Sequence, residues 1–123
     1  MAAKQKIITP KRGEVYLVNF DPTLGAEIKK TRPALVLQNN IANEHSPITI
    51  VAAITSKYDD ELYPTEVLIS AREGGLSVDS VVLLNQVRSI DRQRLIKRLG
   101  MVKAETTENV DQALQISFGL IEL

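Results

Sequence analysis

The stretch of residues 11–40 constrains the fold most, because it joins two strand-like apolar runs through a long polar segment. The runs cover residues 15–20 and 34–37, and each has the length and composition of a β-strand. Pro33 fixes its own φ and biases Arg32 toward extended geometry. We therefore expect strand, long loop, strand, with the Arg32 guanidinium at the point where the loop becomes rigid sheet, which is a suitable layout for an anion site.

Four more strand-length runs follow along the chain. Residues 48–54 form a continuous apolar run without helix signals, which indicates a central strand buried on both faces. Further strands are expected at 65–70, 79–90 and 95–102. The connections are predicted as a polar loop over 39–47, a charged loop over 58–64, a Gly-Gly turn at 74–75 and a capped helical turn at 91–94.

The apolar period changes near the C-terminus. Apolar or small residues recur there at helical spacing, at Val110, Ala113, Leu114, Ser117, Phe118 and Ile121. This pattern predicts an amphipathic helix opened by Thr106 or Thr107, which must pack on the sheet or on a second subunit. Six strands with short connections and one helix predict a mainly β fold, a small and strongly bent sheet or barrel closed by the helix.

Length and composition limit the alternatives. A chain of 123 residues is expected to form one domain, with a flexible N-terminal extension over 1–10 and a single domain over 11–123. The absence of cysteine excludes disulfides and thiolate metal sites, and it is compatible with a reducing cytoplasm. No apolar stretch approaches the roughly 20 residues of a membrane span, and no signal peptide is visible.

The formal net charge is zero, but the charges are segregated. Basic residues gather at the N-terminal start and over residues 88–98, whereas residues 59–61 are acidic and every charge after Lys103 is negative. Such a chain can present a cationic face to phosphates although the whole is neutral. The alternative for each cluster is a solvated face of a helix or turn.

Six blocks of sequence carry a resemblance to a known family. They read Arg-Gly-Glu-Val-Tyr at 12–16, Asp-Pro at 21–22 with Gly25 and Glu27, Thr-Arg-Pro-Ala-Leu-Val-Leu-Gln-Asn at 31–39, Ile-Val-Ala-Ala-Ile-Thr at 50–55, Val-Leu-Leu-Asn-Gln-Val-Arg-Ser-Ile-Asp at 82–91 and Ala-Leu-Gln-Ile-Ser at 113–117. Through these blocks the chain resembles the MazF/PemK family of toxin endoribonucleases over nearly its whole length.

The resemblance implies a fold, an activity and partners. The fold is an SH3-like (CcdB/PemK-type) small β-barrel of about six to seven strands with a C-terminal α-helix. The activity is sequence-specific cleavage of single-stranded RNA in the cytoplasm, without a metal or another cofactor. The implied partners are a second copy of the chain, as a homodimer, and a cognate MazE-like antitoxin whose disordered C-terminal tail fills the same surface.

The resemblance also implies site residues. The arginine of the Arg-Pro pair and the threonine that ends the Ala-Ile-Thr strand carry catalysis, which corresponds to Arg32 and Thr55. Glu27 lies near the substrate, Gln86 lies on the base-reading surface, and Gly25 belongs to the RNA-binding loop. The chain departs from the family pattern at Ala26, Ile28 and Asn85, and these departures affect the preferred RNA sequence more than the chemistry.

The proposed residues suit RNA cleavage by the 2′-hydroxyl. Arg32 offers a permanently charged donor fork for the phosphoryl oxygens, and the Thr55 hydroxyl can orient the scissile group. Arginine is a poor proton acceptor, so Glu27 is the candidate general base. His45 is the only histidine and cannot form a two-histidine acid and base pair, so we expect it to be structural or solvated.

Each assignment has a structural alternative. Arg32 could be a surface salt-bridge residue, Thr55 an ordinary strand end, and Glu27 a solvated partner for Lys29 or Lys30. Gln86 could satisfy a hydrogen bond at a sheet edge. Ser56 and Lys57 are predicted to bind RNA phosphates only because they follow Thr55.

Competing functions also stay open at this point. The first is a toxin of the same fold that binds DNA gyrase, as CcdB-like members do. The second is an RNA-binding barrel that cuts nothing, and the third is a structural dimer module. The residues do not name the cleaved RNA sequence or the antitoxin.

Overall fold

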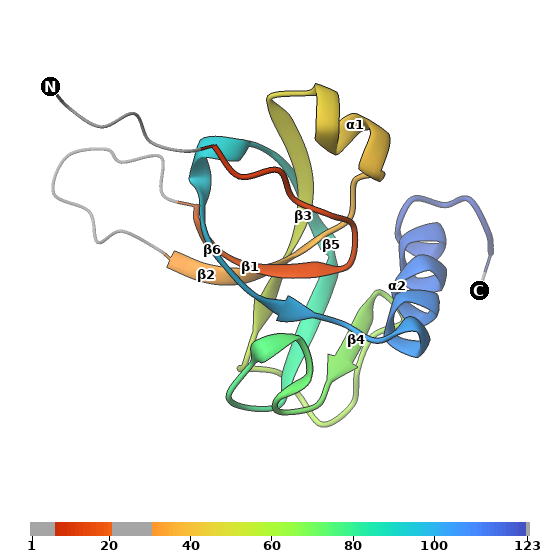
Figure 1. The fold of residues 1–123 in the computed structure, drawn as a ribbon. Coiled ribbons are helices and arrows are strands. Elements are labelled where there is room, and N and C mark those ends of the chain that lie inside the picture. The colour runs from red at the N-terminus through yellow and green to blue at the C-terminus, as the bar shows by residue number, and fades with distance from the viewer. Residues whose placement is uncertain (1–6, 21–30, 123) are drawn as a thin grey trace, which may run out of the picture.

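The six strands of the computed structural model, which describes residues 7–20 and 31–122, form one antiparallel sheet. The strands follow the spatial order β4-β5-β3-β2-β1-β6. Figure 1 shows a strongly curved sheet with helix α2 beside it. The predicted mainly β fold with a C-terminal helix is confirmed, and the strands are β1 (Glu14–Asn19), β2 (Thr31–Val36), β3 (Ile48–Thr55), β4 (Glu66–Ile69), β5 (Ser80–Asp91) and β6 (Leu95–Met101).

Strand β3 is central, as its apolar sequence predicted. It pairs with β2 on one side and with β5 on the other. Its residues 51–54 are buried, in keeping with a run that has no polar side chain to turn toward water. Strand β2 begins at Thr31, three residues before the apolar run at 34–37, because Thr31 and Arg32 extend the ladder with β1.

The two edge strands, β4 and β6, do not pair with each other within the described residues. A short 3₁₀ turn, η1 (Glu73–Gly75), packs against β6 instead. The approach needs glycine on both sides: a Cβ on Gly75 would lie 2.0 Å from the Leu99 carbonyl oxygen, and one on Gly100 would lie 2.5 Å from the Gly74 carbonyl carbon. The predicted Gly-Gly turn therefore brings the two ends of the curved sheet together.

Two apolar clusters lie on opposite faces of the sheet, because side chains alternate along each strand. Val15 of β1 belongs to the cluster that also contains Val110 and Ala113 of α2. Tyr16 and Val18 of β1 belong to the second cluster, together with Phe20. The Tyr16 and Phe20 rings are thus core residues.

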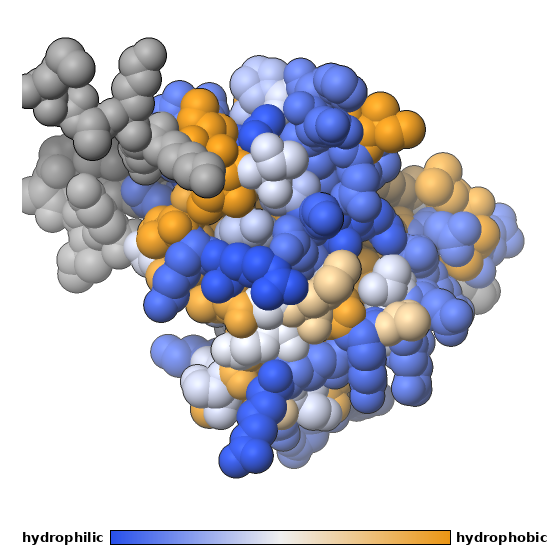
Figure 2. Space-filling model, in the orientation of Figure 1, coloured by the Kyte–Doolittle hydropathy of each residue, from blue (hydrophilic) through white to orange (hydrophobic). Residues whose placement is uncertain are grey.

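Helix α2 (Ala104–Ser117) differs from its prediction at both ends. It begins at Ala104, two residues before Thr106, and its N-cap is Lys103, which makes no side-chain capping bond. Thr106 does not cap the helix, because its buried hydroxyl donates a hydrogen bond to Glu73. It ends at Ser117, so Phe118 and Ile121 lie beyond the helix and are 60% and 39% exposed. Figure 2 shows hydrophobic side chains gathered at that end of α2.

The expected loop at 39–47 is wrong, because a short helix, α1 (Asn40–His45), forms there. Its N-cap is Asn39, whose side chain accepts a hydrogen bond from the Ala42 amide at 2.8 Å. The buried Asn43 side chain donates to the Gln38 carbonyl and accepts from the Thr49 hydroxyl. Asn39 and Asn43, which suggested a solvated loop, therefore form their hydrogen bonds within the protein and not with water. The capped turn expected at 91–94 is confirmed as η2 (Arg92–Arg94), with the Asp91 side chain as its cap.

Candidate active site

Arg32 and Thr55 line the same hollow on the surface. Ala34 pairs with Ala53 in the β2–β3 ladder, and Arg32 and Thr55 each lie two residues from this pair, so alternation sets both side chains on the same face of the sheet. Both side chains line a hollow of about 370 Å³, here called the Thr55 hollow. Its lining comes from the ends of β2 and β3, the loop after β3 and the segment before β5, and consists of Arg32, Pro33, Ile54, Thr55, Ser56, Lys57, Leu76, Ser77, Val78 and Ser80.

The Thr55 hydroxyl is held by the backbone two residues further along. Its oxygen accepts a hydrogen bond from the Lys57 amide at 3.1 Å, and the hydroxyl can donate to the Lys57 carbonyl at 3.3 Å. The accepted bond fixes the oxygen position, whereas the longer donated bond is easily exchanged, because a hydroxyl proton rotates to its best acceptor. Thr55 can therefore present a donor to an anion in the hollow without moving its oxygen.

Ser56 and Lys57 also line the Thr55 hollow, and both are exposed. Three residues that line the Thr55 hollow were not predicted from the sequence, namely Ser77, Val78 and Ser80. They are distant from Thr55 in the chain and belong to none of the blocks that carry the resemblance. Only the pairing of Thr55 with Val81 in the β3–β5 ladder brings them to the site.

A second, smaller hollow lies next to the first and shares Arg32 with it. This Gln86 hollow has a volume of about 130 Å³ and is lined by Phe20, Arg32, Ala53, Gln86 and Arg88. Gln86 and Arg88 are exposed residues of β5, two positions apart and therefore on one face of the strand. The Arg88 guanidinium carbon lies 5.1 Å from the centre of the Phe20 ring. Arg88 was not singled out from the sequence, although its spacing from Gln86 was a usable signal.

Three further residues were considered in the sequence, namely Gly25, Glu27 and His45. Glu27 and Gly25 lie outside the described residues. His45 is exposed in the last turn of α1 and lines neither the Thr55 hollow nor the Gln86 hollow.

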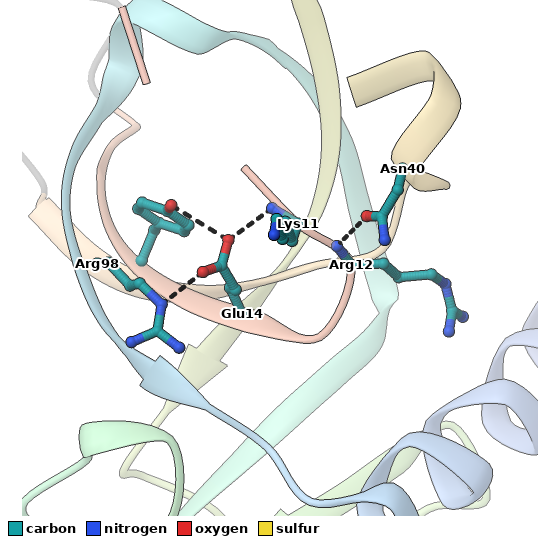
Figure 3. Close-up of polar contacts among 6 residues, drawn as sticks. Lys11, Arg12, Glu14, Asn40 and Arg98 are labelled. Atoms are coloured by element: carbon teal, nitrogen blue, oxygen red, sulfur yellow. Dashed lines mark hydrogen bonds and ion pairs between the residues drawn. The ribbon is translucent and has the colours of Figure 1, made fainter. Parts of the chain in front are cut away.

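A separate charged network surrounds the buried Glu14 carboxylate on β1 (Figure 3). The carboxylate accepts hydrogen bonds from the Lys11 amide at 2.6 Å and from the Tyr16 hydroxyl at 3.2 Å, and it forms an ion pair with Arg98. Burial, reinforced by the negative charge of Glu14, raises the pKa of Tyr16 to about 12. No buried side-chain nitrogen or oxygen among the described residues lacks a hydrogen-bond partner, so this network stabilises the fold.

The described residues contain neither a candidate metal centre nor a candidate membrane-spanning helix. Within residues 7–20 and 31–122 there is no cluster of three or more His, Cys, Asp or Glu side chains that could hold a metal ion. No helix in the same part of the chain is long and apolar enough to cross a membrane.

Comparison with known proteins gives consistent results. Residues 11–118 match the model of the PemK-like, MazF-like toxins of type II toxin–antitoxin systems. Endoribonuclease EndoA of Bacillus subtilis is 46% identical over 112 residues, which cover 91% of this chain and 97% of EndoA. The MazE–MazF crystal structure (Form II) from Deinococcus radiodurans superposes with a TM-score of 0.79 and 31% identity, over 93% of this chain and 99% of that one.

A more distant structure shares the fold. A mycobacterial endoribonuclease at 22% identity superposes with a TM-score of 0.77, over 97% of this chain and 100% of that one. Together with the family match, these likenesses confirm the predicted MazF-type fold and the prediction of an endoribonuclease toxin. The chain therefore belongs to the PemK-like, MazF-like toxin family of type II toxin–antitoxin systems.

Proposed function

We propose that this chain cleaves single-stranded RNA, including mRNA, at a short specific sequence and without a metal ion. In this reaction the 2′-oxygen attacks the adjacent phosphorus and the bond from phosphorus to the 5′-oxygen breaks. The products are a 2′,3′-cyclic phosphate and a free 5′-hydroxyl. The observation that carries the proposal is the presence of Arg32 and Thr55 in one hollow, on opposite strands of one face.

Each catalytic residue has a role that follows from its chemistry. The Arg32 guanidinium stabilises the charge that develops on the phosphoryl oxygens, because its planar donor fork matches a phosphate and stays protonated. Thr55 donates a hydrogen bond from its hydroxyl to a phosphate oxygen and orients the scissile group. Glu27, which lies outside the described residues, is the proposed general base that takes the 2′-hydroxyl proton, and the departing 5′-oxygen takes up a proton from water.

The proposed RNA-binding residues surround this centre. The exposed Lys57 and Ser56, which line the Thr55 hollow, bind backbone phosphates. Gln86 reads a base from the neighbouring hollow. Gly25, which lies outside the described residues, is proposed as a further RNA-binding residue. Because Asn85 adjoins Gln86, the preferred sequence is expected to differ from that of relatives with a glutamate there.

The proposal includes two protein partners and a place of action. A homodimer is supported by the exposed apolar residues beyond α2, namely Phe118, Leu120 and Ile121. A cognate MazE-like antitoxin, with a disordered C-terminal tail, is proposed to cover the RNA-binding face, and the site of action is the cytoplasm. Sedimentation of a monomer at micromolar concentration would refute the dimer.

The test is digestion of a long natural RNA by the purified protein in the presence of EDTA. We expect discrete fragments with 2′,3′-cyclic phosphate and 5′-hydroxyl ends, and sequencing of the 5′ ends gives the recognised sequence. Intact RNA would refute the enzyme, and RNA that is bound but uncut would indicate the non-catalytic RNA-binding barrel. Arg72→Ala is a matched control, since Arg72 is an exposed arginine that lines neither hollow.

A further inference from the structure

The Gln86 hollow contains two cations and no acid. Of its five lining residues, Arg32 and Arg88 are the charged ones, and both are exposed. Within the described residues neither guanidinium forms a hydrogen bond or an ion pair with a carboxylate. Two like charges at one small hollow repel each other, and an anion bound between or beside them offsets this electrostatic repulsion.

Arg88 is held in place by an aromatic ring. Its guanidinium lies over Phe20, which is 8% exposed and packed in the second apolar cluster. A cation over a ring face is attracted to the π electrons, while its N–H donors remain available at the edge of the guanidinium plane. Arg88 is thus oriented without being neutralised, as an anion-binding group requires.

The sheet sets Arg88 in line with the proposed catalytic pair. Arg88 pairs with Val51 of β3, so its side chain shares a face with Val51, Ala53 and Thr55. Ala53 lines the Gln86 hollow, and Thr55, two residues further along β3, lines the Thr55 hollow. Arg32 lines both hollows. A strand of RNA that crosses Arg32 at the scissile phosphate therefore reaches Gln86 and Arg88 next.

We propose that Arg88, positioned by Phe20, binds a second backbone phosphate of the RNA, next to the scissile one, and so fixes the nucleotide that Gln86 reads. This inference rests on the proposed function. Arg88 contributes to RNA binding and register, whereas Arg32 and Thr55 contribute to the chemical step. The Gln86 hollow is accordingly a phosphate subsite as well as a base-reading subsite.

The test compares Arg88→Ala and Arg88→Lys with the wild type. The probe is an RNA oligonucleotide of the sequence found by 5′-end mapping, in a cleavable form and in a form with one 2′-deoxy nucleotide at the cut. For Arg88→Ala we expect about 10-fold weaker binding and a correspondingly raised KM, with kcat nearly unchanged. The slope of log K against log salt should fall by about 0.7, which is one phosphate contact on a single strand.

Two further variants sharpen the test. Arg88→Lys keeps the charge but loses the donor fork, so it should keep the salt slope and lose only part of the affinity. Phe20→Leu removes the ring face while it preserves most of the buried volume, and it should weaken binding less than Arg88→Ala. The control is Lys97→Ala, an exposed cation of β6 outside both hollows, which should change neither affinity nor slope.

Several results would overturn the inference. Unchanged KM and salt slope in Arg88→Ala would remove Arg88 from RNA binding while the proposed function stands. A fall in kcat at constant KM would assign Arg88 to the transition state, and weakened binding of the antitoxin alone would assign it to that partner. A wild-type protein that cuts no RNA would overturn both proposals together.

Discussion

Four arginines of this molecule, Arg32, Arg88, Arg92 and Arg98, differ in their partners. Arg92 donates to the Ile8 carbonyl at 2.8 Å, the Ser46 carbonyl at 3.1 Å and the Thr9 hydroxyl at 2.7 Å. Arg98 is paired with the buried Glu14. Arg32 and Arg88 instead face the two adjacent hollows, with no such partner among the described residues.

This difference in partners shows which arginines are available to bind a ligand. Arg88, Arg92 and Arg98 belong to one basic cluster in the sequence, yet Arg92 and Arg98 hold the fold together, whereas Arg88 lines the Gln86 hollow. A donor fork already satisfied by carbonyls or a carboxylate gains little from a phosphate. The predictions below test this division between structural and ligand-binding groups.

The largest effect is expected for Arg32→Ala. Loss of the main donor to the phosphoryl oxygens should lower kcat by about 10³-fold or more, with no change in thermal stability, because Arg32 is exposed and holds nothing in place among the described residues. Single-turnover cleavage and a melting curve measure the two quantities. An unchanged rate would remove Arg32 from the mechanism.

Thr55→Val should lower kcat by about 10²-fold, since it removes one hydroxyl donor and leaves Arg32 in place. Thr55→Ser is the matched control, because it keeps the hydroxyl and its bond from the Lys57 amide. If Thr55→Val and Thr55→Ser were equally active, the hydroxyl would have no catalytic role.

Glu14→Gln should show the opposite pattern, a loss of stability without a change in the chemistry. Removal of the charge leaves Arg98 without its ion pair, and because Arg98 is half-exposed we expect a cost of about 1–3 kcal/mol in the free energy of unfolding. Chemical denaturation measures that cost. A selective fall in kcat at unchanged stability would place Glu14 in the active site.

The smallest effect concerns the Tyr16 hydroxyl. Its folded-state pKa is raised from 10.0 to about 12, mainly by burial, so the neutral phenol is favoured in the fold. The associated stability is complete below pH 10 and is lost as the pH rises through about 12. Absorbance titration should show one phenol that ionises near pH 12, and Tyr16→Phe should remove that step.

Local patterns were enough to predict most of the sheet. Apolar runs and turn residues located all six strands, and these depend on short-range properties, namely strand propensity, proline geometry and alternation. The pair of Arg32 and Thr55 came instead from the family resemblance of the Arg-Pro and Ile-Thr blocks, and the sheet sets both residues on one face.

Features that depend on distant partners were not predictable in the same way. The helix α1 forms because Asn43 is satisfied by Gln38 and Thr49, which the run of asparagines alone does not reveal. The early start of α2 depends on a bond from Thr106 to Glu73. Likewise, Arg88 becomes a candidate only when Phe20 is seen beneath it and Arg32 beside it.

The most direct test of the central claim uses an RNA substrate with one 2′-deoxy nucleotide on the 5′ side of the cut. If Arg32 and Thr55 act on a phosphodiester that is attacked by its own 2′-hydroxyl, this single change should abolish cleavage at that position while the oligonucleotide still binds. Cleavage of the 2′-deoxy substrate at the wild-type rate would contradict the mechanism.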